Sequence, residues 1–141
     1  MRVRGGRRVR AVAEVLRALA VLVRVEFGLR RTDLRTTCRK LGVRCDLTST
    51  AAPPDERAVL PRRARVPINA AYLVVSRWPA GDTCLRQCLV IGHRLRDLDP
   101  VLRIGVRREP DGAFSAHSWL EVGGRSLDPA AVGYAALGST G

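Results

Sequence analysis

The chain has 141 residues, enough for a single domain with a modest core, and it carries a formal charge of +12. This charge suits nucleic acid, an anionic membrane or an acidic peptide, or it marks a solvated Arg-rich surface. Aromatic residues make up 4% of the sequence, too few for a base-stacking surface, so we expect no nucleic-acid partner. The apolar run Ala11–Val25 contains Glu14, Arg17 and Arg24, which argues against a signal peptide and against stable membrane insertion.

The N-terminal half is predicted to be a helical region followed by a loop. Residues 1–8 are basic and contain glycine, and we predict a flexible arm. Over residues 9–31 apolar residues recur at helical spacing, which predicts an amphipathic helix. Packing in the core is the expected role of its apolar face, and docking to a partner or a membrane surface is the alternative. The residues of this face are Val9, Val12, Leu16, Leu19, Val23 and Phe27.

Two features complete the predicted region 9–67. A second short helix is predicted over residues 32–41, ended by Gly42. The four prolines between residues 46 and 67 then predict a loop with at most one helical turn. We see no domain boundary in this loop and expect a single domain overall.

Residues 68–132 are predicted to form the catalytic core, and residues 133–141 a C-terminal tail. A helix is predicted over residues 69–78, ended by Pro79, and another from Asp82 or Thr83 to about Asp97. The predicted antiparallel strands are Val101–Arg107, Phe114–Val122 and Arg125–Asp128, with turns at residues 109–112 and 123–124.

The turn at Gly123-Gly124 decides which side chains share a face of the last hairpin. If these two glycines are the turn residues, Trp119 faces Asp128. His117 has the same parity as Trp119, so it lies on the same face as Asp128, on a cross-strand diagonal. Such neighbours are roughly 7–8 Å apart at the backbone, within reach of a hydrogen bond between carboxylate and imidazole. A shift of one residue would place the two side chains on opposite faces.

Cys84, His117 and Asp128 have the residue types of a nucleophilic triad. Cys84 follows the helix N-cap signal Asp82-Thr83. A free thiol has a pKa of about 8.5, and a helix N-terminus and an imidazolium both favour the reactive thiolate. Asp128 would orient the imidazole and stabilise its charged form. The N–H of Cys84 would hold the oxyanion of an acyl-transfer intermediate, whereas the contact between thiol and imidazole must come from the tertiary fold.

The other thiols and the remaining histidine are expected to be structural. The spacings C-x6-C and C-x3-C do not match the usual zinc-ligand pairs, and we expect neither metal nor cofactor. Without an export signal, a cytoplasmic protein with free thiols is expected. Cys88, one turn after the proposed nucleophile, is expected in the core. Cys38, Cys45 and His93 are expected to have no chemical role.

Three segments within Thr83–Pro129 carry a family resemblance: CLRQCL, LRIGVRR and FSAHSWLEVGGRSLDP, in this order. Together they resemble the stand-alone lasso-peptide leader peptidases, a small branch of the transglutaminase-like, papain-fold cysteine enzymes. The resemblance implies an α+β fold in which a Cys-bearing helix packs on a small antiparallel sheet. It also implies removal of the leader from a ribosomally made precursor. A separate recognition domain would deliver the leader, and a separate ATP-dependent lasso cyclase would act afterwards.

Residue by residue, the resemblance implies Cys84 as the nucleophile of the family's Cys-Leu-x-x-Ser-Leu motif. It implies His117 as the histidine of its Ala-His-Ala-Trp pattern, and Asp128 as the acid after the Gly-Arg turn. Cys88 stands where the family has Ser, and Ser118 where it has Ala. The resemblance also implies that a Thr near the cut in the precursor is read by the enzyme.

Several alternatives stay open from the residues alone. The same triad would support acyl transfer to an amine, a basic non-enzymatic nucleic-acid-binding protein would explain the charge, and an inactive scaffold would keep the fold without the chemistry. Glu14 and Glu26 are expected to form neither a metal site nor an acid/base site. A further hypothesis from charge is that Arg103, Arg107 and Arg108, beside the sheet, attract an acidic leader.

Overall fold

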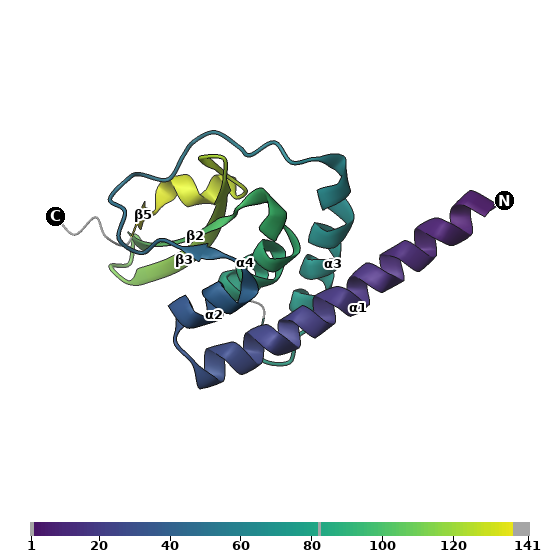
Figure 1. Cartoon of the computed structure of the whole chain (residues 1–141). Coiled ribbons are helices and arrows are strands. Elements are labelled where there is room, and N and C mark those ends of the chain that lie inside the picture. Colours follow the sequence, from purple (N-terminus) through teal and green to yellow (C-terminus); the bar gives the residue numbers. More distant parts are fainter. Residues whose placement is uncertain (1, 82, 137–141) are drawn as a thin grey trace.

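The computed structural model describes residues 2–81 and 83–136, which form helices packed on a small mixed sheet (Figure 1). This is the predicted α+β class. Three short 3-10 helices also occur: η1 (Arg62–Ala64), η2 (Arg96–Leu98) and η3 (Pro129–Gly133). The remaining elements, in chain order, are α1 (Arg2–Arg31), α2 (Leu34–Leu41), β1 (Arg44–Cys45), α3 (Arg65–Ser76), α4 (Cys84–Arg94), β2 (Val101–Arg108), β3 (Phe114–Val122), β4 (Arg125–Ser126) and β5 (Ala135–Ala136).

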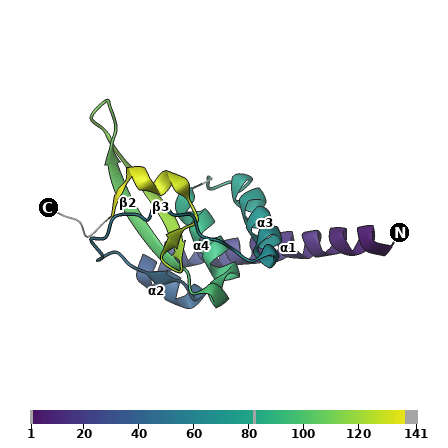
Figure 2. The same ribbon diagram turned by 90° about the horizontal axis from the view of Figure 1, so that it is seen from above.

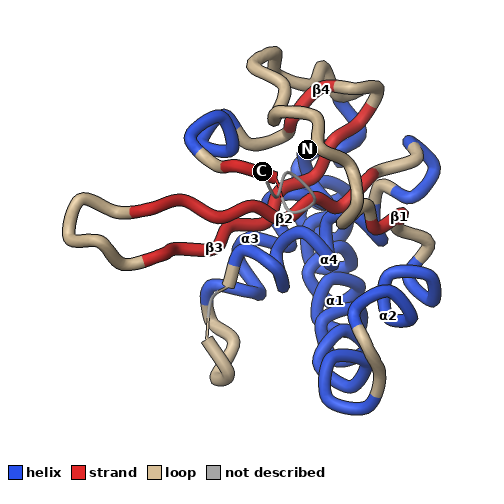
Figure 3. The backbone as a smooth tube through the Cα atoms, turned by 90° about the vertical axis from the view of Figure 1, so that its left-hand side faces the viewer, coloured by secondary structure: helices blue, strands red, loops and turns tan. Residues whose placement is uncertain are grey.

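The sheet is built around one long antiparallel ribbon. Its strand order is β1-β2-β3-β4, with β1 parallel to β2, and β5 pairs with β2 as well. β2 and β3 pair along their whole length, and their far end extends beyond the helices as a free hairpin (Figures 2 and 3). α4 packs against the sheet, and α1 and α3 lie behind it (Figure 2). The start of α4 and the middle of β3 are therefore neighbours.

The last hairpin has the predicted register. Val122 pairs with Arg125 across a two-residue turn, and both turn glycines have the left-handed backbone that such a turn requires, with φ of 60° at Gly123 and 73° at Gly124. β4 is shorter than predicted, because the chain leaves the ladder and enters η3 at Pro129. The adjoining edge of β3 is thus left without a strand partner.

One hydrophobic cluster joins the two halves of the chain. Its fully buried members include Leu22 of α1, Val75 of α3, Leu89 of α4 and Leu102 of β2. The helices of the first half thus pack directly on the helix and sheet of the second half. This shared core stabilises the whole chain as one packing unit.

The predicted orientation of α1 is wrong. The apolar stripe of this helix, which we define as Val9, Val12, Leu16, Leu19, Val23 and Phe27, is exposed to solvent, with exposed fractions from 40% to 70%. The side chains that pack in the core lie on another face: Ala18, Val21, Leu22 and Val25. Two ion pairs select this face, because Glu14 bonds Arg94 and Glu26 bonds Arg86 of α4. An apolar pattern alone does not show which of two apolar faces turns inward.

Two helices, α1 and α3, begin earlier in the chain than predicted. Residues 2–8, expected to be a flexible arm, continue α1, and the helix extends past the rest of the molecule (Figure 1). Helical hydrogen bonds propagate into this basic segment from the long helix that follows it. α3 begins at Arg65, before the predicted start, because Pro67 is tolerated in the first turn of a helix.

The described segment after Asp128 covers Trp119. η3 and β5 lie here, and Ala131 and Ala136 pack with the fully buried indole. Gly105 permits this approach, since a Cβ at that position would lie 2.7 Å from the carbonyl oxygen of Ala135 and 2.9 Å from the indole. The predicted tail at 133–141 therefore includes a short strand, while residues 137–141 lie outside the described part of the chain.

Candidate active site

Cys84 is the first residue of α4. The preceding Thr83 is the N-cap, and its side-chain oxygen accepts a hydrogen bond from the N–H of Arg86 at 3.3 Å. Asp82, the other residue of the predicted N-cap signal, lies outside the described residues. At this position the N–H of Cys84 has no acceptor within the helix, and the partial positive charge of the helix start acts on the sulfur. The local sequence therefore places the sulfur at the N-terminal end of α4.

A half-buried ion-pair cluster holds this end of α4 against α1. The Nε and Nη2 atoms of Arg86 donate to the two carboxylate oxygens of Glu26, at 2.9 and 3.3 Å. Trp78 Nε1 donates to the same carboxylate at 3.3 Å, and Arg86 Nη1 donates to Thr83 Oγ1 at 3.2 Å. Hydrogen bonds from Arg86 lower the pKa of Glu26 to about 2. Glu26 thus has a positioning role that sequence reasoning did not find.

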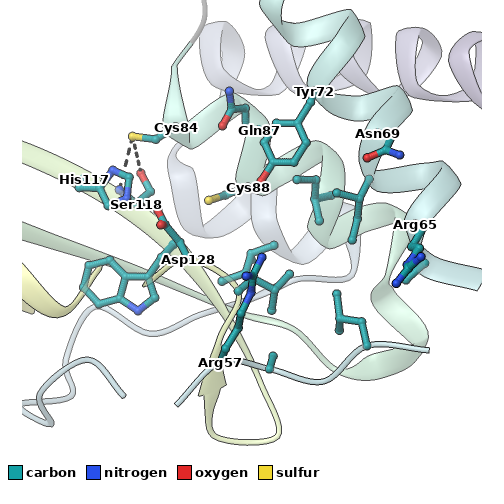
Figure 4. Close-up of a pocket in the computed structure, with 18 of the residues that line it drawn as sticks. Arg57, Arg65, Asn69, Tyr72, Cys84, Gln87, Cys88, His117, Ser118 and Asp128 are labelled. Carbon is teal, nitrogen blue, oxygen red and sulfur yellow. Dashed lines mark hydrogen bonds and ion pairs between the residues drawn. The ribbon is translucent and has the colours of Figure 1, made fainter. Parts of the chain in front are cut away.

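The sulfur of Cys84 lies on the open edge of β3. The backbone N–H of Ser118 donates to Sγ at 3.4 Å, and the Ser118 hydroxyl lies 3.5 Å from the same sulfur (Figure 4). This N–H is available because β4 pairs with β3 only at Glu121 and Val122. Ser118 therefore holds the sulfur of Cys84 at this edge of the strand. Sequence comparison with the family pattern showed Ser118 only as a small substitution, so its contact with the thiol was missed.

His117 and Asp128 form the predicted pair. His117 Nε2 lies 2.5 Å from Asp128 Oδ2. The other carboxylate oxygen, Oδ1, accepts the N–H of Ala130 at 2.9 Å and so caps η3. The backbone N–H of Asp128 in turn donates to Ser126 Oγ at 3.0 Å. The carboxylate is therefore fixed at both oxygens, and it fixes the orientation of the imidazole.

Two aromatic rings enclose the imidazole on the face away from α4. Tyr134 lies with its ring centroid 5.0 Å from that of His117, and Trp119 stacks at 6.5 Å. Trp119 Nε1 donates to Glu121 at 3.0 Å, which fixes the indole in turn. Trp119 thus packs within the fold. Tyr134 was not predicted because it lies in a weakly patterned segment, and no local signal there would have identified it.

The pairing leaves a defined role for each ring nitrogen. Asp128 occupies Nε2, so Nδ1 is the ring nitrogen that remains to exchange a proton with a thiol. Within the described residues, the sulfur of Cys84 is hydrogen-bonded to Ser118 and not to the imidazole. Cys84, His117 and Asp128 nevertheless all line one cleft (Figure 4).

The cleft has a volume of about 440 Å³ and runs from the thiol toward the N-terminal end of α3. Its apolar lining comes from Leu60, Ile68, Ile91 and Leu127. Arg65 lines the end away from the thiol, with Tyr72 and Asn69 between, whereas Arg57 lies on the side of Asp128 (Figure 4). Neither guanidinium forms an ion pair with a described residue. These residues lie in the loop and the start of α3, where no motif marked them as part of a site.

The other thiols and His93 have structural surroundings, in keeping with the prediction for each. Burial raises the pKa of Cys88, and burial raises the pKa of Cys38 to about 12. Cys45 is half-buried and its pKa is raised for the same reason. His93 Nδ1 lies 2.8 Å from the carbonyl oxygen of Leu41, and burial lowers the pKa of the ring. All four cysteines are free thiols.

The arginines that were expected to attract an acidic leader are already engaged. Arg103 is buried and lies 3.4 Å from a carboxylate oxygen of Glu121, and it also donates to backbone carbonyls of the loop. Arg107 pairs with Glu109 at 2.8 Å. Arg108 lies over the ring of Phe114 on the free hairpin. The first two do not present an uncompensated charge to a leader, so the hypothesis is not supported for them.

Neither a metal site nor a membrane-spanning helix is found among the described residues. No three side chains of His, Cys, Asp or Glu in this part of the chain are grouped as a metal site requires. None of the helices within residues 2–81 and 83–136 is both long enough and apolar enough to span a bilayer.

A thiol at a helix start, beside a His–Asp pair on an antiparallel ribbon, is the arrangement of a cysteine-nucleophile enzyme of the transglutaminase-like type. A family model described as the transglutaminase-like superfamily matches residues 19–138. The chain therefore belongs to the transglutaminase-like superfamily, in which cysteine-based catalysis is typical. The match crosses the predicted boundary at residue 67 and includes the C-terminal part of α1, from Leu19 to Arg31. Neither the comparison with curated proteins nor that with solved structures gave a match.

Proposed function

We propose that this protein is a cysteine peptidase that removes the leader from a ribosomally made lasso-peptide precursor. The observation that carries the catalytic part is the placement of Cys84 at a helix start, on the β3 edge beside the hydrogen-bonded pair His117–Asp128. The finer assignment rests on the three segments that resemble lasso-peptide leader peptidases. The transglutaminase-like superfamily supports the thiol chemistry and the fold.

The proposed reaction uses each group in turn. Nδ1 of His117 takes the thiol proton, and the thiolate of Cys84 attacks the carbonyl carbon of the scissile peptide bond. The backbone N–H of Cys84 donates to the oxyanion that forms. The imidazolium, stabilised by Asp128, then protonates the leaving amine as the C–N bond breaks. Water attacks the thioester, His117 takes one proton of that water, and the free thiol is regenerated with the cleaved carboxylate.

The cleft supports an extended peptide as substrate. Its apolar lining would accept an aliphatic side chain near the cut, because burial of apolar surface on both sides stabilises the complex. Arg57 and Arg65 would bind a carboxylate farther along the same peptide. We therefore propose that the precursor has an acidic residue in the part of the peptide that lies along α3 when it is bound. Which residue reads a Thr near the cut stays outside this proposal.

The proposed partners follow from the same resemblance. A separate leader-recognition domain would bind the leader and deliver the precursor, and a lasso cyclase would act on the cleaved product. Four free thiols suit a reducing compartment, and we propose that the protein works in the cytoplasm.

Incubation of precursor, recognition domain and this chain tests the proposal directly. Mass spectrometry should show leader and core as two products with the wild-type chain. Cys84→Ala and His117→Ala should give neither product, while Cys45→Ser, which changes another half-buried thiol, should cleave like the wild type. Cleavage by Cys84→Ala at the wild-type rate would exclude the thiol mechanism.

Acyl transfer to an amine is a second candidate function, favoured by the superfamily to which the chain belongs. The thioester on Cys84 would then react with an amine in place of water. Addition of a primary amine to the same assay separates the two functions. A product heavier by the amine minus water supports transfer, and unchanged hydrolysis products at high amine concentration support the peptidase.

A further inference from the structure

The apolar stripe of α1 lies on the outside of the molecule. Its six side chains are 40% to 70% exposed, and they follow one another along about 27 Å of helix. At Gly5 and Gly6, the preceding turn, an added Cβ would meet nothing within 4 Å, so this end of the helix is surrounded by open space. Contiguous exposed apolar surface of this kind marks an interaction site.

The spacing of the stripe is that of a coiled coil. Val9, Val12, Leu16, Leu19 and Val23 are separated by three and four residues in alternation. This heptad spacing keeps one seam facing a neighbouring helix over several turns. A flat or irregular partner would not require such regularity, so the pattern favours a second α-helix lying along α1.

A row of arginines runs beside the stripe at the same period. Arg10, Arg17, Arg24 and Arg31 are each seven residues apart, and all four are exposed. Among the described residues, only Arg17 of this row forms an ion pair with a carboxylate, that of Glu14. Arg31 lies with its guanidinium 5.0 Å from the ring centroid of Phe27, at the end of the stripe. The flank of the seam is therefore positively charged.

The carboxylates of α1 do not balance this charge. The helix contains only Glu14 and Glu26, and both are engaged toward the core, with Arg94 and Arg86 of α4. Side-chain exposure is 7% for Glu14 and 12% for Glu26. A second copy of α1 would place arginine rows of two chains of charge +12 beside each other, which like-charge repulsion disfavours. Acidic side chains are the complement of this surface.

An apolar groove lies where the stripe ends. It has a volume of about 300 Å³ between α1 and α2, with Val23, Phe27 and Leu41 among its apolar lining and Arg24 and Lys40 among its charged lining. An apolar side chain at the end of a bound helix would fill it, and an adjacent carboxylate would meet the two cations. Such an anchoring pocket beside a longer seam is typical of a helix-binding surface.

We propose that the apolar stripe binds one acidic amphipathic helix of a partner protein, which lies along α1 and anchors in the groove between α1 and α2. The proposal is independent of the chemistry at Cys84, because the stripe lies on a surface formed by α1 and α2, away from the cleft residues. It assigns to α1 a recruiting role in addition to its packing role.

A designed peptide tests the proposal. The probe is a labelled helix of about four heptads with Leu at the a and d positions and Glu at the e and g positions. Binding to the full chain is measured by fluorescence anisotropy. Two control peptides replace every Glu by Lys, or every Leu by Gln. The acidic amphipathic peptide should bind at least about tenfold more tightly than either control.

Variants of the chain locate the bound peptide. Combined substitution V12S, L16S and L19S should weaken binding at least about tenfold, whereas V132S, which changes an exposed apolar residue elsewhere, should not. Circular dichroism checks that each variant is folded. As a second measurement that leaves the apolar seam intact, R10E with R24E brings the row to two charges of each sign and should remove most of the preference for the acidic peptide.

Four results would overturn the proposal. Equal binding of the acidic and basic peptides would show that charge does not select the partner. Wild-type affinity in a folded stripe variant would show that the peptide does not bind at the stripe. A stable dimer in sedimentation that the stripe variant dissociates assigns the surface to a second copy. Binding of the stripe to phosphatidylglycerol vesicles, with no binding of the acidic peptide, assigns it to a membrane.

Discussion

His117 Nε2 and Asp128 Oδ2 lie 2.5 Å apart across a hairpin whose turn is made by two glycines. Both oxygens of the Asp128 carboxylate are hydrogen-bonded, because Oδ1 accepts the N–H of Ala130 and so caps η3. One residue therefore links the orientation of the imidazole to the path of the chain after the sheet. This double role determines which substitution at residue 128 is informative.

Asp128→Asn should lower kcat/KM for precursor cleavage by roughly 10²–10⁴-fold with the fold intact. The amide oxygen can still accept the N–H of Ala130, whereas the negative charge that stabilises the imidazolium is lost. Steady-state cleavage kinetics over a pH series, with thermal unfolding in parallel, check this. Asp111→Asn, in the distant turn of the free hairpin, is the matched control. Equal losses of activity in both variants would contradict a specific role for residue 128.

Cys84 should react with iodoacetamide before the other thiols at neutral pH. It is half-buried at a helix start and accepts a hydrogen bond from Ser118, whereas burial raises the pKa of Cys88, Cys38 and Cys45. Peptide mapping by mass spectrometry after partial alkylation gives the order of labelling. His117→Ala should slow the labelling of Cys84 and leave that of Cys45 unchanged. Faster labelling of Cys88 would contradict the assignment.

Glu26→Gln should destabilise the protein only above about pH 2. The pKa of Glu26 is depressed from its ordinary value near 4.5 to about 2, chiefly by hydrogen bonds from Arg86. A carboxylate with a depressed pKa stabilises the fold fully above its unfolded-state value, and this stabilisation is lost as the pH falls from about 4.5 to about 2. We expect a loss of about 1–2 kcal/mol in unfolding free energy at pH 6, after screening by solvent.

Urea denaturation of wild type and Glu26→Gln at several pH values between 2 and 7 measures this difference. The difference in unfolding free energy between the two proteins should be constant above about pH 5 and close to zero near pH 2. Glu56→Gln is the control, since its pair with Arg125 is exposed and should contribute little. A gap that persists unchanged at pH 2 would show that charge on Glu26 is not the cause.

Arg57→Gln combined with Arg65→Gln should raise KM about three- to tenfold for a precursor with an acidic residue beside the cut, with little change in kcat. Both arginines line the cleft and neither is hydrogen-bonded to the sulfur of Cys84, so they would bind substrate and leave the reacting atoms untouched. Kinetics at two salt concentrations, with a substrate in which Gln replaces the acidic residue, test this. Arg62→Gln, an exposed arginine outside the cleft, is the control. If the Gln substrate shows the same rise in KM, the charge argument is wrong.

Local pattern was sufficient for the elements around the proposed triad. Alternation of apolar and polar residues predicted β3 at its observed bounds, and Gly123-Gly124 fixed the register that brings His117 to Asp128. Thr83 predicted the start of α4 and hence the place of Cys84. These features depend on neighbours in the chain or on one tight turn, which is why they are readable without a tertiary structure.

Tertiary packing decided everything that joins distant segments. The sequence by itself determined a Cys-bearing helix, a His–Asp hairpin and a strongly basic chain. Only the fold decided that Ser118 contacts the sulfur, that Arg57 and Arg65 line the cleft, and that the apolar stripe of α1 faces solvent. The physical reason is that α1 has two apolar faces of similar hydrophobicity. The ion pairs of Glu14 and Glu26 with α4, partners 80 and 60 residues away, select between them.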